Sequence, residues 1–310
     1  VQLIHVVAKE ELFGKYVYFS SGMPTASAYW NSYSSEIIAG FLRDQDGLVV
    51  EIGSNDGILL KFFQEKGFRV QGIDPARNIV AAARENGIPT LEGFFSLTVA
   101  QEILKNHGQP RVVLANNVVA HIDDYDDFWS GIRLLVGGGG VLVMEAPYLM
   151  DMFNHLAYDT IYHEHLSFLA VKPLRKILQR FGLEIFDARI VESQGHSLRL
   201  FISGSGNYPV KSSVGYLAAE EAKGGLGEPR SYFELASKVR KAKNRLISVL
   251  EGLKEGGQRI AAYGAPAKGN TLLNYSRIGV RILDYALDEL PSKQGLYTPG
   301  MHIPVVGRDY

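Results

Sequence analysis

The sequence of 310 residues contains no cysteine, so disulfide-stapled secreted domains, thiolate catalysis and thiolate metal sites are excluded. Charge of one sign is not in excess either, because the formal net charge is -1 at pH 7, and no global basic field attracts nucleic acid or an anionic membrane. No apolar run reaches the roughly 18 to 20 residues that cross a bilayer, and Val1 to Glu11 lack the pattern of a signal peptide. We therefore expect a cytoplasmic protein without nucleic-acid or membrane partners.

Strand-like and helix-like segments alternate from Leu48 onward, which is typical of a parallel sheet covered by helices on both faces. A parallel sheet closed by a late antiparallel pair is typical of class I methyltransferases, so we predict an α/β fold with a Rossmann-like, doubly wound sheet. The expected strands are 48–52, 69–73, 112–115, 140–145 and the antiparallel pair 184–192 and 197–203. The expected helices are 57–66, 76–86, 125–135 and 172–181.

A second, smaller α/β domain is expected at the carboxyl terminus. Residues 211–229 are rich in Gly, Ser and Lys and are interpreted as a connector to one long amphipathic helix, 232–254. Strand 259–263, a helix from about Gly269 and strand 281–287 follow. Because Val1 is not methionine and Tyr310 directly follows an apparent strand, we expect the chain to be part of a longer one. The predicted domains are an amino-terminal arm 1–31, a main domain 32–206, a connector with the long helix 207–257, and a final domain 258–310.

The first candidate site is the turn after the first strand, which reads Glu-Ile-Gly-Ser-Asn-Asp-Gly at 51–57. Its glycines let the backbone approach a ligand closely, and the helix that follows presents free amides. The turn does not match G-x-G-x-x-G, and Asp56 would repel a pyrophosphate at this place. A cofactor without phosphates is therefore favoured over a dinucleotide, and a plain connecting turn is the alternative.

Two further signals follow the next strands. Asp74, 21 residues beyond Gly53, can accept hydrogen bonds from both hydroxyls of a ribose, and Ala-Asn-Asn at 115–117 lies where open α/β sheets bind ligands. Together these signals resemble the class I methyltransferase pocket for S-adenosylmethionine. The resemblance implies that Glu51 faces the methionine amino end, that Gly53 forms the floor, and that Phe94 or Phe95 flanks adenine. The predicted cofactor-binding residues are Glu51, Gly53, Asn55, Gly57, Asp74, Pro75, Phe94 and Asn116.

The segment 158–165, Tyr-Asp-Thr-Ile-Tyr-His-Glu-His, is too dense in titratable side chains for an ordinary solvated loop. His163 and His165 would project to opposite sides of a strand and lack the i, i+4 spacing of a helical zinc site, so we expect no metal. A histidine can act as a base near neutral pH, and a neighbouring glutamate or tyrosine can orient it or stabilise an enolate. Methyl transfer to carbon needs such a base, but O-methylation can use one too, and a polar cluster that only pins a loop is a third interpretation.

The run Tyr162-His163-Glu164-His165 resembles the sugar C-methyltransferases of deoxysugar biosynthesis, together with the turn 51–57, Ala-Asn-Asn followed by His121, and Gly-His-Ser-Leu-Arg at 195–199. The resemblance spans residues 14 to 310. It implies transfer of a methyl group from S-adenosylmethionine to a carbon next to the ketone of a nucleotide-linked 4-keto-deoxyhexose. A thymidine-type nucleotide is the expected carrier. Members begin with a cysteine-rich zinc-binding domain, and this chain contains no thiolates for one.

Site roles follow from this resemblance. His165 matches the general base that forms the enolate, and its neighbours Tyr162 and Glu164 match residues at the sugar. The remaining residues predicted to line the same cavity are Asn117, His121 and Tyr16. The rival functions are an O- or N-methyltransferase of the same fold, and a nucleotide-sugar-binding or NAD-dependent oxidoreductase protein.

The turn 263–271, Tyr-Gly-Ala-Pro-Ala-Lys-Gly-Asn-Thr, is the candidate diphosphate site. Amides at a helix start and the Lys268 charge can receive a pyrophosphate, although the turn is not a Walker A loop and a plain loop is the alternative. In the run 195–199, the Arg199 guanidinium can bind phosphate bidentately. The predicted substrate-binding residues are Lys268, Tyr263, Gly264, Ser197 and Arg199.

Other conspicuous residues have structural interpretations. Trp30 and Trp129 are expected to be packing residues rather than partners of the cofactor. The acidic run 123–127 is expected to cap the helix 125–135, because negative charge is favoured at a helix amino terminus.

Overall fold

The computed structural model describes residues 2–22, 25–42, 47–193 and 195–310. The chain forms two compact units, Val1–Leu149 with Leu166–Lys223, and Met150–His165 with Gly224–Tyr310. Residues 150–165, which the sequence analysis placed in the domain 32–206, therefore belong to the same unit as the carboxyl-terminal residues. Among the described helices, none is both long and apolar enough to cross a membrane.

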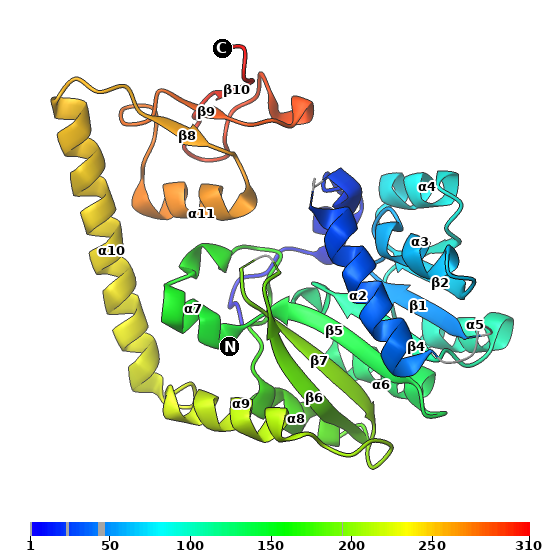
Figure 1. Ribbon diagram of the computed structural model, residues 1–310. Coiled ribbons are helices and arrows are strands. Elements are labelled where there is room, and N and C mark those ends of the chain that lie inside the picture. The colour runs from blue at the N-terminus through cyan, green and yellow to red at the C-terminus, as the bar shows by residue number, and fades with distance from the viewer. Residues whose placement is uncertain (1, 23–24, 43–46, 194) are drawn as a thin grey trace. The chain divides into compact units, whose positions relative to one another are not determined.

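A seven-stranded sheet in the order β3-β2-β1-β4-β5-β7-β6 forms the centre of the first unit (Figure 1). Strands β1 to β5 are parallel, and β7 is antiparallel to both β5 and β6. This arrangement confirms the predicted doubly wound α/β sheet with its late antiparallel pair; β3 was not expected. The strands are β1 Leu48–Ile52, β2 Arg69–Asp74, β3 Thr90–Glu92, β4 Val112–Asn116, β5 Val141–Pro147, β6 Leu183–Val191 and β7 Ser197–Gly204.

Helices pack on both faces of this sheet, since its central strands are buried apolar runs whose side chains alternate between the faces. On one face, α2 and α3 contribute Tyr33, Ile37, Leu60 and Phe63 to a core shared with sheet residues such as Val49. On the other, α5 packs against α6 (Figure 1). The helices are α1 Lys9–Phe13, α2 Ala26–Phe41, α3 Ile58–Gln64, α4 Arg77–Glu85, α5 Leu97–His107, α6 Tyr125–Val136, α8 Val171–Gln179 and α9 Ser212–Lys223, with short 3-10 helices η1 Ser20–Gly22 and η2 Val119–His121.

Two of these helices depart from the predicted organisation. The expected connector 211–229 contains α9, whose Val214 and Leu217 are buried against the unit, so tertiary packing overrides the Gly- and Ser-rich composition. Helix α2 spans residue 31, where the arm was expected to end.

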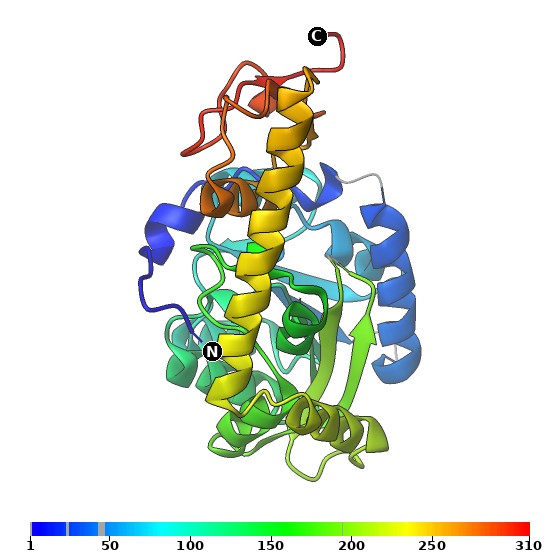
Figure 2. The same cartoon turned by 90° about the vertical axis from the view of Figure 1, so that its left-hand side faces the viewer.

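The second unit is built on a three-stranded parallel sheet in the order β10-β9-β8. Its core consists of Ile278, Leu283, Ala286 and Ile303, against which side chains of the 27-residue helix α10 pack; Figure 2 shows this helix along its length. A smaller carboxyl-terminal α/β domain, as predicted, is thus present. Its elements are α7 Leu149–His155, η3 Tyr158–Thr160, α10 Pro229–Glu255, β8 Ala261–Tyr263, α11 Ala267–Ser276, β9 Tyr285–Leu287, η4 Pro291–Lys293 and β10 Val305–Val306.

Candidate active site

A pocket of about 210 Å³ lies in the first unit at the carboxyl ends of β1, β2 and β4. Strands β1 and β4 are neighbours in the sheet although the chain runs from β1 to β2, and open α/β sheets bind ligands at such a switch point. The predicted cofactor residues that line the pocket are Glu51, Gly53, Asn55, Asp74, Pro75, Phe94 and Asn116.

The two glycines of the turn 51–57 have different roles. Gly53 lines the pocket with φ +67°, and a Cβ there would lie 2.5 Å from the Val118 side chain, so only glycine allows this approach. Gly57 is not among the lining residues. It has φ +81°, caps α3, and would place a Cβ 2.7 Å from Ile88. The fold itself therefore requires glycine at this position, and its predicted contact with the cofactor stays a prediction.

The Asp74 carboxylate is held in a defined orientation on the pocket wall. Its Oδ2 accepts a hydrogen bond from the Asn55 amide at 3.0 Å, and its Oδ1 accepts one from the Ala76 amide at 3.0 Å. Burial raises its pKa, whereas the two amides act in the opposite direction. Because each carboxylate oxygen has two lone pairs, Asp74 can still accept bonds from ribose hydroxyls.

Glu51 is a buried carboxyl group on the pocket wall. Its side chain lines the pocket, only 5% of the residue is exposed, and Oε2 has no hydrogen-bond partner among the described residues. Burial first, and then Asp74 and Asp56, raise the pKa of Glu51 well above its ordinary value. Such a group is costly unless a cation meets it. S-adenosylmethionine carries an ammonium and a sulfonium, so this donor set fits that cofactor.

Aromatic side chains form much of the remaining wall. Phe94 and Phe95 both line the pocket, as expected for residues beside adenine. Trp30 also lines it, which corrects the interpretation of Trp30 as a packing residue only, whereas Trp129 is fully buried as expected. The capping prediction is confirmed, because the Asp124 side chain accepts from the Asp127 amide at the start of α6.

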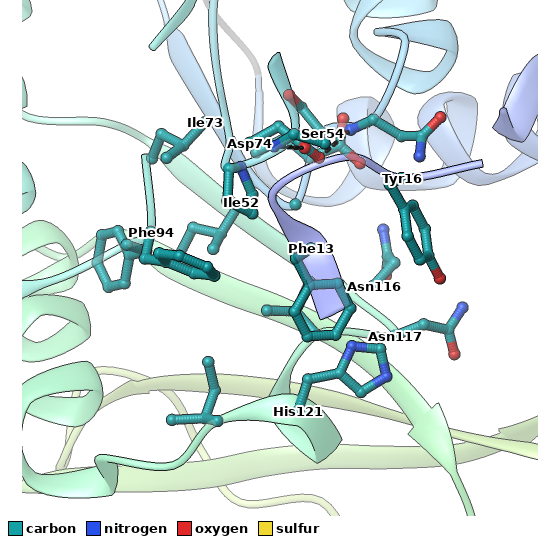
Figure 3. A pocket seen from close by; sticks show the side chains of 18 of the residues that line it. Phe13, Tyr16, Ile52, Ser54, Ile73, Asp74, Phe94, Asn116, Asn117 and His121 are labelled. Carbon is teal, nitrogen blue, oxygen red and sulfur yellow. Dashed lines mark hydrogen bonds between the residues drawn. The ribbon is translucent and has the colours of Figure 1, made fainter. Parts of the chain in front are cut away.

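The residues assigned to the sugar side, Tyr16, Asn117 and His121, line the same pocket (Figure 3). Phe13 stacks on His121, with ring centroids 5.3 Å apart and an interplanar angle of 14°. The sequence analysis missed Phe13 and the other amino-terminal lining residues, Lys9, Tyr18 and Ser20. A signal for this part of the chain was the concentration of aromatic residues at 16–19, where Tyr16, Tyr18 and Phe19 lie outside any helical or strand pattern.

Arg199 and Ser197 are buried, and each already has hydrogen-bond partners within the first unit. The Arg199 guanidinium is buried and donates to Glu145 at 2.7 Å and to Glu36 at 2.6 Å. The Ser197 hydroxyl donates to the Ser193 carbonyl at 2.8 Å. Both assignments to the substrate are corrected: carboxylates already occupy the guanidinium, and β7 pairing buries the serine.

His165 belongs to the second unit and is buried there. Only 7% of it is exposed, and its Nδ1 lies 2.8 Å from the Thr160 carbonyl. A carbonyl only accepts, so Nδ1 carries the proton and the neutral ring has its lone pair on Nε2. The Tyr162 hydroxyl lies 3.3 Å from that Nε2, and the two ring centroids are 4.4 Å apart. Burial first, and then the charge of Lys268, lower the pKa of His165.

The second unit also contains the predicted diphosphate turn. Gly264 has φ +87°, and Lys268 follows in the first turn of α11, which contacts η3 at the start of the histidine segment. The structure thus brings Lys268 and His165 together in one unit, near enough for the lysine charge to act on the imidazole. Tyr263 is 77% exposed, and its hydroxyl donates to Glu289 at 2.8 Å.

Comparisons with known proteins identify the family of this chain. The chain matches the model of the C-methyltransferase C-terminal domain over residues 192–310 and that of the methyltransferase domain over 31–188. C-methyltransferase NovU from Streptomyces niveus is 31% identical over 304 residues, which cover 98% of this chain and 72% of NovU.

Solved structures show lower similarity. Magnesium protoporphyrin IX methyltransferase (ChlM) from Synechocystis PCC 6803 with bound SAH is 18% identical, with a TM-score of 0.43 over 58% of this chain and 83% of that one. A SAM-dependent methyltransferase from Archaeoglobus fulgidus is 15% identical, with a TM-score of 0.44 over 57% and 93%. The family models and NovU show that the chain belongs to the C-methyltransferases that use S-adenosylmethionine.

Proposed function

We propose that this C-methyltransferase methylates a carbon next to the ketone of a nucleotide-linked 4-keto-deoxyhexose, with His165 as the base. The resemblance of the 162–165 run to sugar C-methyltransferases supports the substrate class. The observation that carries the mechanism is the imidazole geometry, in which Nδ1–H donates to Thr160 and leaves the basic lone pair on Nε2. When bound, S-adenosylmethionine supplies the electrophilic methyl group that an enolate carbon accepts.

His165 has the protonation state that enolate formation requires. A carbon next to a ketone loses its proton to Nε2, the C–H electron pair forms the enolate double bond, and negative charge moves onto the ketone oxygen. Because burial and Lys268 lower the pKa of His165, the ring is neutral and basic at pH 7. The Thr160 carbonyl then accepts from Nδ1–H of the imidazolium and stabilises it.

Tyr162 is the donor nearest to that base. Burial, with Glu164 and Asp159 nearby, raises the pKa of Tyr162 to about 12, so its hydroxyl keeps its proton at neutral pH. A protonated hydroxyl beside the base can donate to the ketone oxygen on which charge develops. We assign Tyr162 to this role, and Glu164 to raising the pKa of the phenol.

We assign the sugar-linked diphosphate to the second unit. Tyr16, Asn117 and His121 remain the residues that we propose to contact the sugar. Lys268 and the turn from Tyr263 to Gly264 supply a cation and helix-start amides for phosphate oxygens. The nucleotide is of the thymidine type in this proposal. Residues 150–165 share a unit with Lys268, so the base and the diphosphate contacts are held on one scaffold.

Hydrogen exchange tests the carbon chemistry against O- or N-methylation. Wild-type protein is incubated with a thymidine-diphosphate 4-keto-6-deoxyhexose in deuterated water without S-adenosylmethionine, and deuterium at the carbon next to the ketone is followed by NMR. We expect exchange, and we expect His165→Asn to slow it by about 10²–10⁴-fold. An enzyme that methylates oxygen or nitrogen does not need this step.

The matched control is His163→Asn, which removes an exposed histidine from the same segment. We expect this variant to exchange at the wild-type rate, and both variants to bind S-adenosylhomocysteine like the wild type in calorimetry. A methylated product without exchange, or substantial exchange by His165→Asn, would contradict the proposal.

A further inference from the structure

The segment 9–21, here called the amino-terminal strap, forms one side of the cofactor pocket. It contains α1 and the start of η1, and it contributes no strand to the sheet. It contributes five lining side chains at short intervals, which are Lys9, Phe13, Tyr16, Tyr18 and Ser20. Figure 3 shows Phe13 against His121, and Tyr16 directed toward the side of the pocket where Asn117 lies. If this segment moved away, the pocket would lose the side wall that these five residues form.

One side chain holds both backbone groups of Tyr16. Asn78 Nδ2 donates to the Tyr16 carbonyl at 2.7 Å, and Asn78 Oδ1 accepts from the Tyr16 amide at 3.2 Å. A neighbouring β-strand forms the same two hydrogen bonds, one with the backbone N–H and one with the backbone C=O of a residue. Asn78 lies in the first turn of α4, directly after the loop that begins with Asp74.

The cofactor turn holds the other end of the strap. Asn55 Nδ2 donates to the Tyr18 carbonyl at 3.1 Å, and Asn55 Oδ1 accepts from the Ser20 amide at 2.8 Å. Asp56 Oδ2 accepts from the Ser21 amide at 3.0 Å. The Asn55 amide donates to Asp74, so the ribose carboxylate and the strap are joined through one residue.

These contacts make the strap dependent on a few side chains. Val17 is 86% exposed, so the segment gains little from apolar burial at its centre. The core beneath α4 is formed by other residues, including Ile79 and Val80. Removal of the Asn78 amide should therefore release Tyr16 without unfolding the unit.

We propose that Asn78 is a positioning residue for methyl transfer. It holds the Tyr16 backbone, and through it the Tyr16 side chain, at the pocket. The role of Tyr16 at the sugar rests on the proposed function, but its attachment by Asn78 does not. Asn78 acts through Tyr16, whereas Asp74 and Glu51 act on the cofactor.

Because the chain contains no cysteine, a single Val17→Cys substitution allows one spin label to be placed on the strap. Electron paramagnetic resonance of that label is compared in the wild-type, Asn78→Ala and Arg77→Ala backgrounds. Arg77 precedes Asn78 on α4, is 84% exposed in its side chain and pairs with Glu92, so Arg77→Ala is the matched control. We expect label mobility to increase in Asn78→Ala only, with an unchanged midpoint of thermal unfolding.

Kinetics supply the second readout. We expect Asn78→Ala to lower kcat/KM for the ketosugar by about tenfold to a hundredfold, since small misplacements of a contacting group have effects of this size. The Kd for S-adenosylhomocysteine should stay within about threefold of the wild-type value, because the Asn78 side chain forms its hydrogen bonds with the Tyr16 backbone. Tyr16→Phe combined with Asn78→Ala should lose little more than the stronger single variant.

Two outcomes would overturn the inference. The first is equal label mobility in Asn78→Ala and Arg77→Ala. The second is a loss of S-adenosylhomocysteine affinity as large as the loss of kcat/KM, which would indicate general damage to the pocket. If the wild type methylates no ketosugar, the proposed function is wrong. The mobility of the spin label at residue 17 still tests whether Asn78 holds the strap, because that measurement does not depend on activity.

Discussion

Two glutamates near the carboxyl ends of strands in the same sheet are both buried but differ in their partners. Glu145 of β5 is 0% exposed and accepts from Arg199 at 2.7 Å and from Tyr29 at 2.8 Å. Glu51 of β1 is 5% exposed, and its Oε2 has no partner among the described residues. Only Glu51 lines the pocket.

The difference separates a structural charge from a binding charge. A buried carboxylate that is fully paired contributes to the architecture, and its loss of hydration is offset within the protein. Ionisation of a buried carboxyl group without a partner costs free energy, and a cationic ligand bound in the cavity reduces that cost. In the sequence both are single glutamates in apolar strands, so burial alone does not distinguish them.

The largest effect on stability is expected when the buried ion pair between Arg199 and Glu145 is removed. Arg199→Met leaves Glu145 buried without its cation and should lower the free energy of unfolding by about 3–5 kcal/mol, measured by urea denaturation. Arg180→Met, which removes a surface pair with Asp126, is the control and should cost less than about 1 kcal/mol. A stable Arg199→Met protein with a raised KM for the sugar would instead restore Arg199 as a phosphate ligand.

Glu51→Gln tests the unpaired charge. Loss of the carboxylate should weaken S-adenosylhomocysteine binding by about 10–100-fold, the size expected for a hydrogen bond to a charged group. Glu65→Gln, at the exposed residue that follows α3, is the control and should bind normally. If calorimetry gives the same Kd for both variants, Glu51 does not meet the amino end of the cofactor.

The pH dependence of stability gives a second test of whether Glu51 pairs with a cationic ligand. Because the pKa of Glu51 is raised in the folded protein, its contribution to stability is complete below the ordinary value of 4.5 and is lost as pH rises through the raised value. A cationic ligand that pairs with the ionised carboxylate offsets this loss. The thermal shift caused by S-adenosylhomocysteine should therefore grow with pH in wild type and stay flat in Glu51→Gln.

The smallest effect is expected on the buried imidazole of His165 in the second unit, which we compare with the two buried glutamates. Lys268→Met removes a charge that lowers the pKa of His165, so the acid limb of the kcat/KM profile should shift to higher pH. The loss of a phosphate contact should also raise the KM of the nucleotide sugar by several-fold. Lys241→Met on the exposed surface of α10 is the control. An unchanged acid limb in Lys268→Met would separate this lysine from the base.

Much of the cofactor site could be predicted because it depends on chain order. Apolar runs define β1, β2 and β4, and parallel strands end at one edge of a sheet, so Gly53, Asp74 and Asn116 had to lie near one another. The strap could not be predicted in this way. Its attachment joins Tyr16 to Asn78 and Ser20 to Asn55 through irregular backbone, and no periodic pattern marks such contacts.

The sequence by itself determined the main strands of the sheet with their late antiparallel pair, the pocket at the switch point and the identity of the family, because these follow from local periodicity and from contiguous motifs. Tertiary structure alone decided which buried charges are paired, which unit holds His165, and where the amino-terminal residues lie. The physical reason is that pairing and burial depend on side chains distant in the chain. Arg199 pairs with Glu145 and Glu36, whereas Glu51 Oε2 has no hydrogen-bond partner in the part of the chain that the structure describes.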